Sequence, residues 1–148
     1  MKHEIVEILL VEDNKGDIVL VKEALKRAKV ANKLTVIEDG QAALDYLLET
    51  KKPDGPTMPG LILLDLNLPK LNGQEVLEKI KQDDNLKFVP VVIMTSSNAE
   101  EDILKAYNHQ ANCYVTKPVD FDQLMRVVNS IESFWLSVVQ LPPARGKK

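Results

Sequence analysis

Short apolar runs alternate with longer segments of helical periodicity along the chain, and this alternation most constrains its fold. Five runs have the length and aliphatic character of strands, at 5–11, 33–37, 61–64, 89–94 and 113–116. Five segments with apolar residues at helical spacing follow them, at 15–28, 40–49, 73–83, 97–108 and 121–139. Parallel neighbours in a sheet need a crossover between them, usually a helix. The pattern therefore predicts an α/β fold with a doubly wound five-stranded parallel sheet of order 2-1-3-4-5, with the short, polar second run at an edge.

The length and composition of the chain suit one globular domain. Its 148 residues are enough to bury a core, which we expect within 1–141, and two prolines then end the last helix and leave 142–148 as a basic, flexible tail. A net charge of −3 argues against a nucleic-acid-binding domain, and the single cysteine excludes an intrachain disulfide. No apolar run approaches the ~20 residues of a membrane span, and the start of the chain lacks a signal-peptide core. We therefore expect a cytoplasmic protein.

Residues that carry chemistry stand where the strands are expected to end. Glu12 and Asp13 follow the first run, Asp65 the third, Thr95 the fourth and Lys117 the fifth. In a parallel sheet of this order the ligand site lies beyond the carboxyl ends of the strands, at the switch point between the first and third strands. Segments more than a hundred residues apart are therefore predicted to bring these side chains to one edge of the sheet.

The residue types at this edge predict a magnesium-dependent phosphoacceptor site. Three converging carboxylates repel one another unless a cation lies among them. Oxygen ligands with positions left open for water and phosphate suit Mg²⁺, so Glu12, Asp13 and Asp65, with a backbone carbonyl from the next loop, form the expected ligand set. An aspartate carboxylate can attack a phosphoryl group and form an aspartyl phosphate. Asp65 ends the central strand as this acceptor, with the Lys117 ammonium and the Thr95 hydroxyl placed to bind phosphoryl oxygens.

Other functions leave different marks in a sequence. Each residue alone can be a helix cap, a turn residue or a surface lysine, but their joint position at four strand ends favours the functional interpretation. Phosphatases of the haloacid dehalogenase class also form an aspartyl phosphate, but they need a second aspartate two residues after the nucleophile as general acid and base, where this chain has Asn67. We therefore expect no enzyme activity beyond slow self-dephosphorylation. A flavodoxin-like cofactor binder needs a phosphate-binding loop after the first strand. This chain has Glu12 and Asp13 there, which would repel a phosphate in the absence of a metal. An adaptor that is never phosphorylated and acts only through dimer or partner binding stays open.

Four motifs resemble those of the receiver domains of two-component response regulators: LLVEDN at 9–14, LLDLNLPKLNG at 63–73, VVIMTS at 91–96 and YVTKP at 114–118. The resemblance covers roughly residues 5–139. It implies a protein of phosphorelay signal transduction that receives a phosphoryl group on Asp65 from a sensor histidine kinase. It also implies that the backbone carbonyl of Asn67 joins the Mg²⁺ ligands, and that Tyr114 is an aromatic switch that turns inward when Thr95 moves toward the phosphate.

Two features depart from the plain family pattern. The loop at 50–60, rich in proline and glycine, is longer than the usual connection, and the last helix continues into an apolar extension that contains Phe134 and Trp135. Contiguous exposed apolar surface tends to mark an interface. Both features are similar to those of the stand-alone response regulators that serve cyanobacterial and bacterial phytochrome histidine kinases. This resemblance implies a phytochrome-type kinase as partner and a homodimer through the fourth helix, fifth strand and fifth helix.

Overall fold

The computed structural model of the protein describes residues 5–28, 31–96, 113–117, 122, 124–126 and 129–130. Its named elements follow the chain in the order β1 (Val6–Val11), α1 (Lys15–Lys26), β2 (Asn32–Ile37), α2 (Gly40–Glu49), β3 (Leu61–Leu64), α3 (Gly73–Gln82), η1 (Leu86–Phe88), β4 (Val91–Thr95) and β5 (Cys113–Thr116). Residues 122, 124–126 and 129–130 are helical and lie within the predicted last helix.

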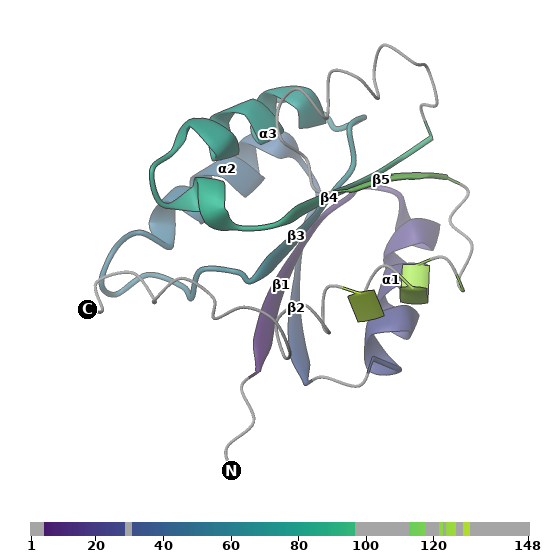
Figure 1. Ribbon diagram of the computed structural model, residues 1–148. Coiled ribbons are helices and arrows are strands. Elements are labelled where there is room, and N and C mark those ends of the chain that lie inside the picture. Colours follow the sequence, from purple (N-terminus) through teal and green to yellow (C-terminus); the bar gives the residue numbers. More distant parts are fainter. Residues whose placement is uncertain are drawn as a thin grey trace.

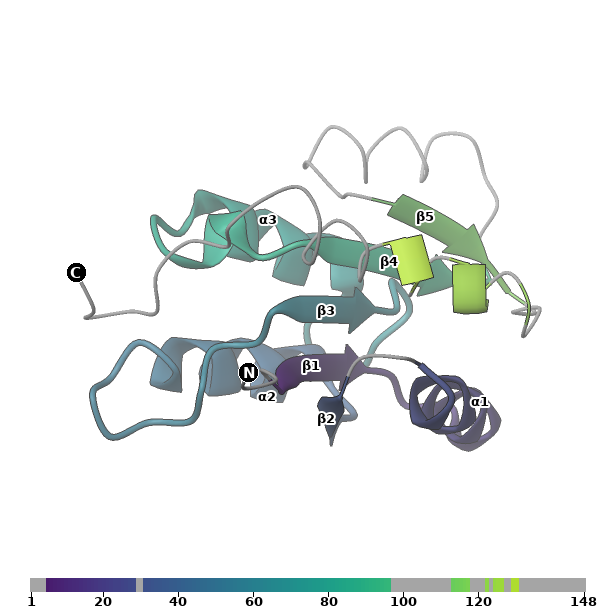
Figure 2. The same ribbon diagram turned by 60° about the horizontal axis from the view of Figure 1, so that its bottom comes forward.

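The five strands form one parallel sheet in the order β2-β1-β3-β4-β5. In Figure 2 the arrowheads of β1, β3 and β5 point the same way, and the strands lie side by side in this order. The predicted topology is confirmed. The carboxyl ends of all the strands therefore meet at one edge of the sheet, with β1 and β3 as neighbours at the switch point.

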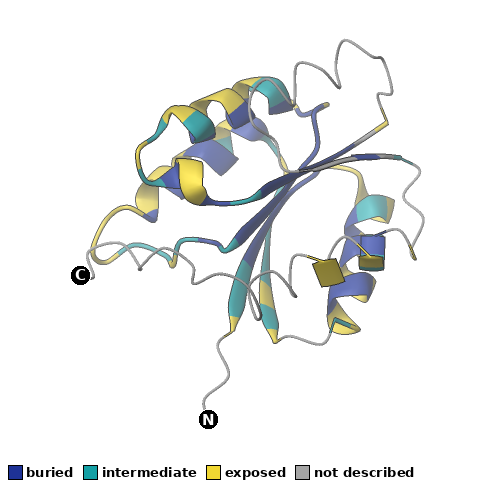
Figure 3. Ribbon diagram, viewed as in Figure 1, coloured by how far each residue is buried: buried dark blue, intermediate teal, exposed yellow. Residues whose placement is uncertain are grey.

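Two apolar cores lie on opposite faces of the sheet. Successive strand residues point to opposite faces, so Leu9 and Val11 join the core under α2 and α3, whereas Ile8 and Leu10 join the core under α1. Figure 1 shows α1 on one side of the sheet and both α2 and α3 on the other. Figure 3 shows that the central strands are buried, and every residue of β3 is buried. Such a strand reads as a continuous aliphatic run because helices cover both of its faces.

Each of the first three helices begins at a polar capping residue. The side chains of Asn14, Asp39 and Asn72 accept hydrogen bonds from backbone N–H groups in the first turns of α1, α2 and α3. In α3 the Glu75 side chain also accepts a hydrogen bond from the backbone N–H of Asn72, which completes a capping box. The caps satisfy N–H groups that have no partner inside the helix, and they set where each helix starts after the preceding strand.

Three details differ from the expectations drawn from the sequence. β2 occupies the sheet edge as predicted, but its six residues make it as long as β1 rather than short. β4 begins at Val91 instead of Val89, because the chain first forms the 3-10 turn η1, which the Val89 N–H closes on the Leu86 carbonyl. Leu48 is part of the apolar pattern of the predicted helix at 40–49, which indicates a position facing the core, but it is 43% exposed because it lies on the outer side of α2.

Several predictions concern segments that lie outside the described residues. They are the fourth helix at 97–108, the apolar extension with Phe134 and Trp135, and the tail at 142–148. The domain boundary at 141 and the dimer face therefore stay predictions. Among the helices that the structure describes, none is long and apolar enough to cross a membrane.

Candidate functional site

Glu12 and Asp65 directly follow the neighbouring strands β1 and β3, at the same level and on the same face of the sheet. Val11 of β1 is paired with Leu64 of β3, so the residues that follow them are also neighbours. The residues two positions before Glu12 and Asp65 belong to the core under α1. Because side chains alternate between faces, Glu12 and Asp65 point to the α1 side as well. Lys117 follows β5 with the same alternation, two residues after Val115 of that core.

Three carboxylates gather at this edge of the sheet. Glu12, Asp13 and Asp65 each offer an oxygen, and these atoms all lie within 4.8 Å of one another. Glu12 has 0% and Asp65 3% of its surface exposed, whereas Asp13 is exposed to solvent. The predicted convergence of the three side chains is confirmed. Asp13 forms the open side of the cluster, and the two buried carboxylates form its inner side.

The Lys117 ammonium lies among the carboxylates. Its Nζ donates to Glu12 Oε1 at 2.6 Å and to Asp65 Oδ2 at 3.4 Å, and it lies 2.8 Å from Asp17 Oδ2. The Lys117 side chain is only 9% exposed. A buried ammonium needs such partners, since an isolated charge away from water is strongly unfavourable. The lysine therefore joins the end of β5 to the ends of β1 and β3 and to the first turn of α1.

The loop after β3 holds Asp65 in place. The Asn67 backbone N–H donates to Asp65 Oδ1 at 3.1 Å, which leaves Oδ2 turned toward the lysine. The Gly73 N–H, at the start of α3, donates to the Leu66 carbonyl at 2.8 Å. A Cβ at Gly73 would lie 2.3 Å from the Asp65 carbonyl oxygen, so only glycine permits this close approach. Lys70 in the same loop has a φ of 74°, a left-handed conformation that tightens the turn.

Burial and charge shift the pKa values of two of these groups. Burial raises the pKa of Glu12 from its ordinary 4.5 to about 7, and the Asp65 charge adds to the rise, while the hydrogen bond from Lys117 opposes it. Burial alone lowers the pKa of Lys117, but hydrogen bonds to Asp17 and Glu12 and the Asp65 charge outweigh it, so its pKa is raised. The lysine is a fixed cation at neutral pH, and Glu12 is a carboxylate that is unfavourable to ionise.

The raised pKa of Glu12 predicts how stability depends on pH without divalent cations. Between pH 4.5 and 7 the folded protein keeps a proton on Glu12 that the unfolded chain releases, so the free energy of unfolding falls as pH rises. The shift in the pKa of Glu12 lowers the free energy of unfolding by about 3 kcal/mol in total across this pH range. Glu12→Gln is expected to lose this part of the slope in urea unfolding at pH 5 and pH 8 with a chelator present. Glu78→Gln, on the exposed side of α3, is the control and keeps the wild-type slope; equal slopes in wild type and Glu12→Gln would contradict the prediction.

The donor set of the cluster fits a hard divalent cation. All three side chains offer carboxylate oxygens, and no histidine or cysteine of the described residues belongs to the group. The single ammonium of Lys117 leaves three neighbouring carboxylates with a net negative charge. Oxygen ligands with an open side toward solvent suit Mg²⁺, which keeps part of its water shell. The site can therefore hold Mg²⁺ next to a nucleophilic carboxylate.

Three other predicted site residues are only partly placed. Asn67 is exposed in the loop after Asp65, and its side-chain amide lies 3.5 Å from Ser96 Oγ, just after β4. The backbone of Thr95 ends β4 in register with Thr116 of β5, and Tyr114 is paired with Ile93. The side chains of Thr95 and Tyr114 lie outside the described residues. The phosphoryl contact of Thr95, the switch role of Tyr114 and the Asn67 carbonyl ligand stay predictions.

Asp17 is the site residue that the sequence reasoning missed. It lies in the first turn of α1, four residues after Asp13, and its carboxylate reaches Lys117. The signal was an acidic residue one helical turn beyond the acidic pair. Acidic residues are common in the first helical turn because they complement the helix dipole. The sequence alone therefore does not distinguish a residue of this kind from a partner of Lys117.

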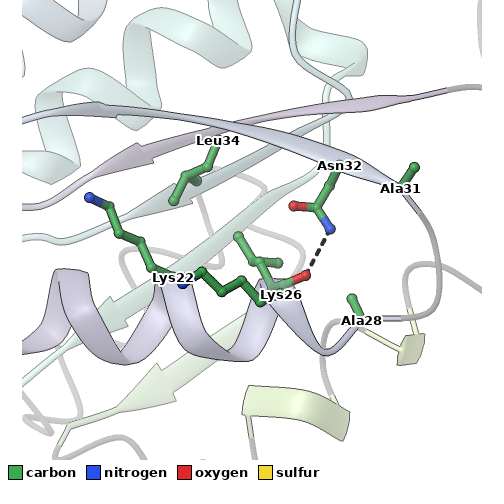
Figure 4. A pocket seen from close by; sticks show the side chains of 7 residues that line it. Lys22, Lys26, Ala28, Ala31, Asn32 and Leu34 are labelled. Atoms are coloured by element: carbon green, nitrogen blue, oxygen red, sulfur yellow. Dashed lines mark hydrogen bonds between the residues drawn. The ribbon is translucent and has the colours of Figure 1, made fainter.

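A cavity of about 580 Å³ lies away from this site. Figure 4 shows the residues that line it, from the second half of α1 to the start of β2: Lys22, Leu25, Lys26, Ala28, Ala31, Asn32 and Leu34. The Asn32 side-chain amide donates to the Leu25 carbonyl at 3.0 Å across it. Because β2 begins here, the cavity lies at the sheet edge opposite the carboxyl ends of the strands. It takes no part in the acidic site.

Known proteins with a similar sequence agree with this geometry. The family model described as "Response regulator receiver domain" matches residues 8–129. Response regulator Rcp1 of Synechocystis sp. is 47% identical over 137 residues, which are 93% of each chain. The probable methanogenesis regulatory protein FilR2 of Methanothrix harundinacea is 41% identical over 129 residues, with 87% of this chain and 83% of that protein covered.

Solved structures extend the likeness to the fold. The Mn²⁺-bound form of Rcp1 superposes with a TM-score of 0.78 at 46% identity, covering 93% of this chain and 99% of that one. The phosphorylated cyanobacterial phytochrome response regulator RcpA superposes with a TM-score of 0.80 at 45% identity, covering 96% of this chain and all of that one. With the family match over most of its length and an acidic site at the switch point of the sheet, the chain belongs to the response regulator receiver domain family.

Proposed function

We propose that this protein accepts a phosphoryl group on Asp65 from a histidine kinase, in a reaction that needs Mg²⁺, and that it signals through phosphorylation-dependent binding to other proteins. One observation carries the proposal. The Asp65 carboxylate lies buried at the end of the central strand, within 4.8 Å of two further carboxylates and 3.4 Å from the Lys117 ammonium. A nucleophilic carboxylate, a hard-cation site and a fixed positive charge are the parts that phosphoryl acceptance requires.

Each residue has a defined task in the transfer. A carboxylate oxygen of Asp65 attacks phosphorus, the bond from phosphorus to the kinase histidine breaks, and the electron pair returns to the imidazole nitrogen. Lys117 donates to one phosphoryl oxygen, and the Thr95 hydroxyl is expected to donate to another. Glu12, Asp13, Asp65 and the Asn67 carbonyl are the residues that would hold Mg²⁺. When bound, Mg²⁺ supplies positive charge that offsets the carboxylates and the phosphoryl oxygens.

The phosphorylated state is expected to persist rather than turn over. Fast hydrolysis of an aspartyl phosphate needs a general acid or base beside it. Asn67, two residues after Asp65, has an amide that carries no transferable proton near neutral pH, and it is exposed. The protein then acts as a phosphoacceptor with slow self-dephosphorylation, which suits a signal rather than metabolic turnover. We propose that it acts in the cytoplasm.

A phytochrome-type kinase is the partner that the relatives support best. RcpA is a cyanobacterial phytochrome response regulator, and it shares 45% of its sequence with this chain over 96% of the chain's length. FilR2, which is 41% identical, is described as a probable methanogenesis regulatory protein, a process other than light sensing. We also propose a homodimer through the fourth helix, β5 and the fifth helix, with Phe134 and Trp135 in the interface and Tyr114 coupling it to the site.

Intact-mass spectrometry after incubation with acetyl phosphate tests the proposal. The wild type is expected to gain the mass of one phosphoryl group with Mg²⁺ and none after chelation, because the three carboxylates then repel the donor. Hydroxylamine, which cleaves acyl phosphates, should remove the added mass. Absence of any gain, when a known receiver domain is labelled in parallel, would favour an adaptor that acts only by binding.

A further inference from the structure

Asp17 contacts Lys117 but lies outside the cluster of Glu12, Asp13 and Asp65. Its Oδ2 lies 2.8 Å from Lys117 Nζ, and its side chain is 22% exposed beside a lysine side chain that is 9% exposed. The ammonium thus has three carboxylate partners, which lie just after β1, just after β3 and in the first turn of α1. Three donor hydrogens for three carboxylates leave the lysine fully partnered and held in one position.

Two of these three partners change during phosphoryl acceptance. Glu12 is one of the residues that would hold Mg²⁺, and Asp65 forms the new bond to phosphorus. The Glu12 carboxylate would then face Mg²⁺, and the Asp65 carboxylate would be bonded to phosphorus. Both would therefore interact less strongly with the Lys117 ammonium. Asp17 is the carboxylate among the three that has no such task, so its contact with Lys117 can persist through the transfer.

The start of α1 keeps the Asp17 carboxylate in place. The Asp17 backbone N–H donates to the Asn14 side chain at 3.0 Å, which fixes the first turn. The next residue, Ile18, is buried in the core under α1 and anchors this turn to the sheet. The partial positive charge at a helix N-terminus also favours a carboxylate here. The anchor of the lysine therefore belongs to a rigid element rather than to a loop.

We propose that Asp17 is a positioning residue that keeps the Lys117 ammonium directed at Asp65 while the phosphoryl group is transferred. This inference rests on the proposed function of Asp65 as the acceptor. Asp17 acts through Lys117 and does not belong to the group of carboxylates that would hold Mg²⁺. Without it the ammonium loses its one constant partner and must be ordered during the reaction itself. Partners that orient a functional group in this way typically change rates by about ten- to a hundredfold.

The test is the rate of phosphorylation by acetyl phosphate at saturating Mg²⁺, followed by intact mass. Asp17→Asn, which keeps the shape and removes the charge, is expected to slow labelling about tenfold. Asp17→Glu keeps the charge and should recover most of the rate. The matched control is Asp83→Asn, which breaks the 2.6 Å ion pair between Asp83 and Lys51 away from the site and should label at the wild-type rate.

A double-mutant cycle separates positioning from a general structural effect. If Asp17 acts through the lysine, Asp17→Asn causes no further slowing in a Lys117→Met background. Two results would overturn the inference, provided that the wild type takes up phosphate. One is that Asp17→Asn is labelled at the wild-type rate, and the other is that Asp17→Asn slows labelling equally with and without the lysine. A wild type that takes up none would instead remove the proposed function, and this inference with it.

Discussion

Replacing Asp65 by asparagine is expected to abolish the Mg²⁺-dependent gain of a phosphoryl group. The amide introduced by Asp65→Asn keeps the shape of the side chain but has no nucleophilic oxygen of comparable strength. Labelling should fall below detection in intact-mass spectra at every donor concentration. The fold should survive, because the change removes one of two buried neighbouring carboxylates without adding volume.

Two control variants show whether the loss is specific to the acceptor. Asp54→Asn, in an exposed loop, makes the same chemical change far from the site and should label like the wild type. Asp13→Asn weakens the cation site but leaves the acceptor, so it should need more Mg²⁺ for half-maximal labelling and still be labelled. Full labelling of Asp65→Asn would contradict the assignment, and peptide mapping would then locate the true acceptor.

Replacing Lys117 by methionine is expected to destabilise the protein by about 3 kcal/mol at pH 8 with a chelator present. Methionine keeps the length of the side chain and removes its charge. The change leaves the carboxylates of Glu12 and Asp65 buried without their ammonium, at 0% and 4% side-chain exposure. Breaking a buried ion pair from one side is far more destabilising than losing an exposed pair. Urea unfolding measures the difference from the wild type.

The origin of this loss can be checked by restoring the charge balance. Mg²⁺ should recover most of the stability, because a cation bound by the folded state alone shifts the unfolding equilibrium. Adding Glu12→Gln to Lys117→Met should also recover part of it, since it removes one of the two buried carboxyl groups that lost their ammonium. Lys51→Met, which breaks a more exposed ion pair to Asp83, should lower the stability by less than about 1 kcal/mol. A Lys117→Met variant as stable as the wild type would contradict the expected dependence of the carboxylates on the lysine.

Much of the fold follows from local patterns in the sequence. The aliphatic run of β3 is buried on both faces, and α2 begins and ends where its apolar periodicity does. The alternation of strands and helices predicts the parallel order because crossover connections leave few arrangements. The placement of Glu12, Asp13 and Asp65 at one edge follows from that order, which is why three of the site's carboxylates could be predicted from the sequence.

Details that depend on neighbouring segments did not follow in the same way. β2 is longer than its apolar run because pairing with β1 over six positions extends it. Leu48 belongs to an apolar pattern but faces away from the sheet, since Ala43, Leu44 and Leu47 already fill the inner side of α2. Propensity and periodicity describe a segment by itself, whereas these outcomes depend on which surface of another segment it meets.

The sequence by itself determined the order of the sheet, the edge where the site lies and the residue types that meet there. These properties depend on periodicity and on the chain connections, which a sequence contains directly. Only the tertiary structure decided that Asp17 reaches Lys117 and that burial raises the pKa of Glu12 to about 7. Both depend on distances of a few ångströms between segments remote in the chain and on the water that packing excludes. Such distances and such desolvation arise only when the sheet and α1 come together.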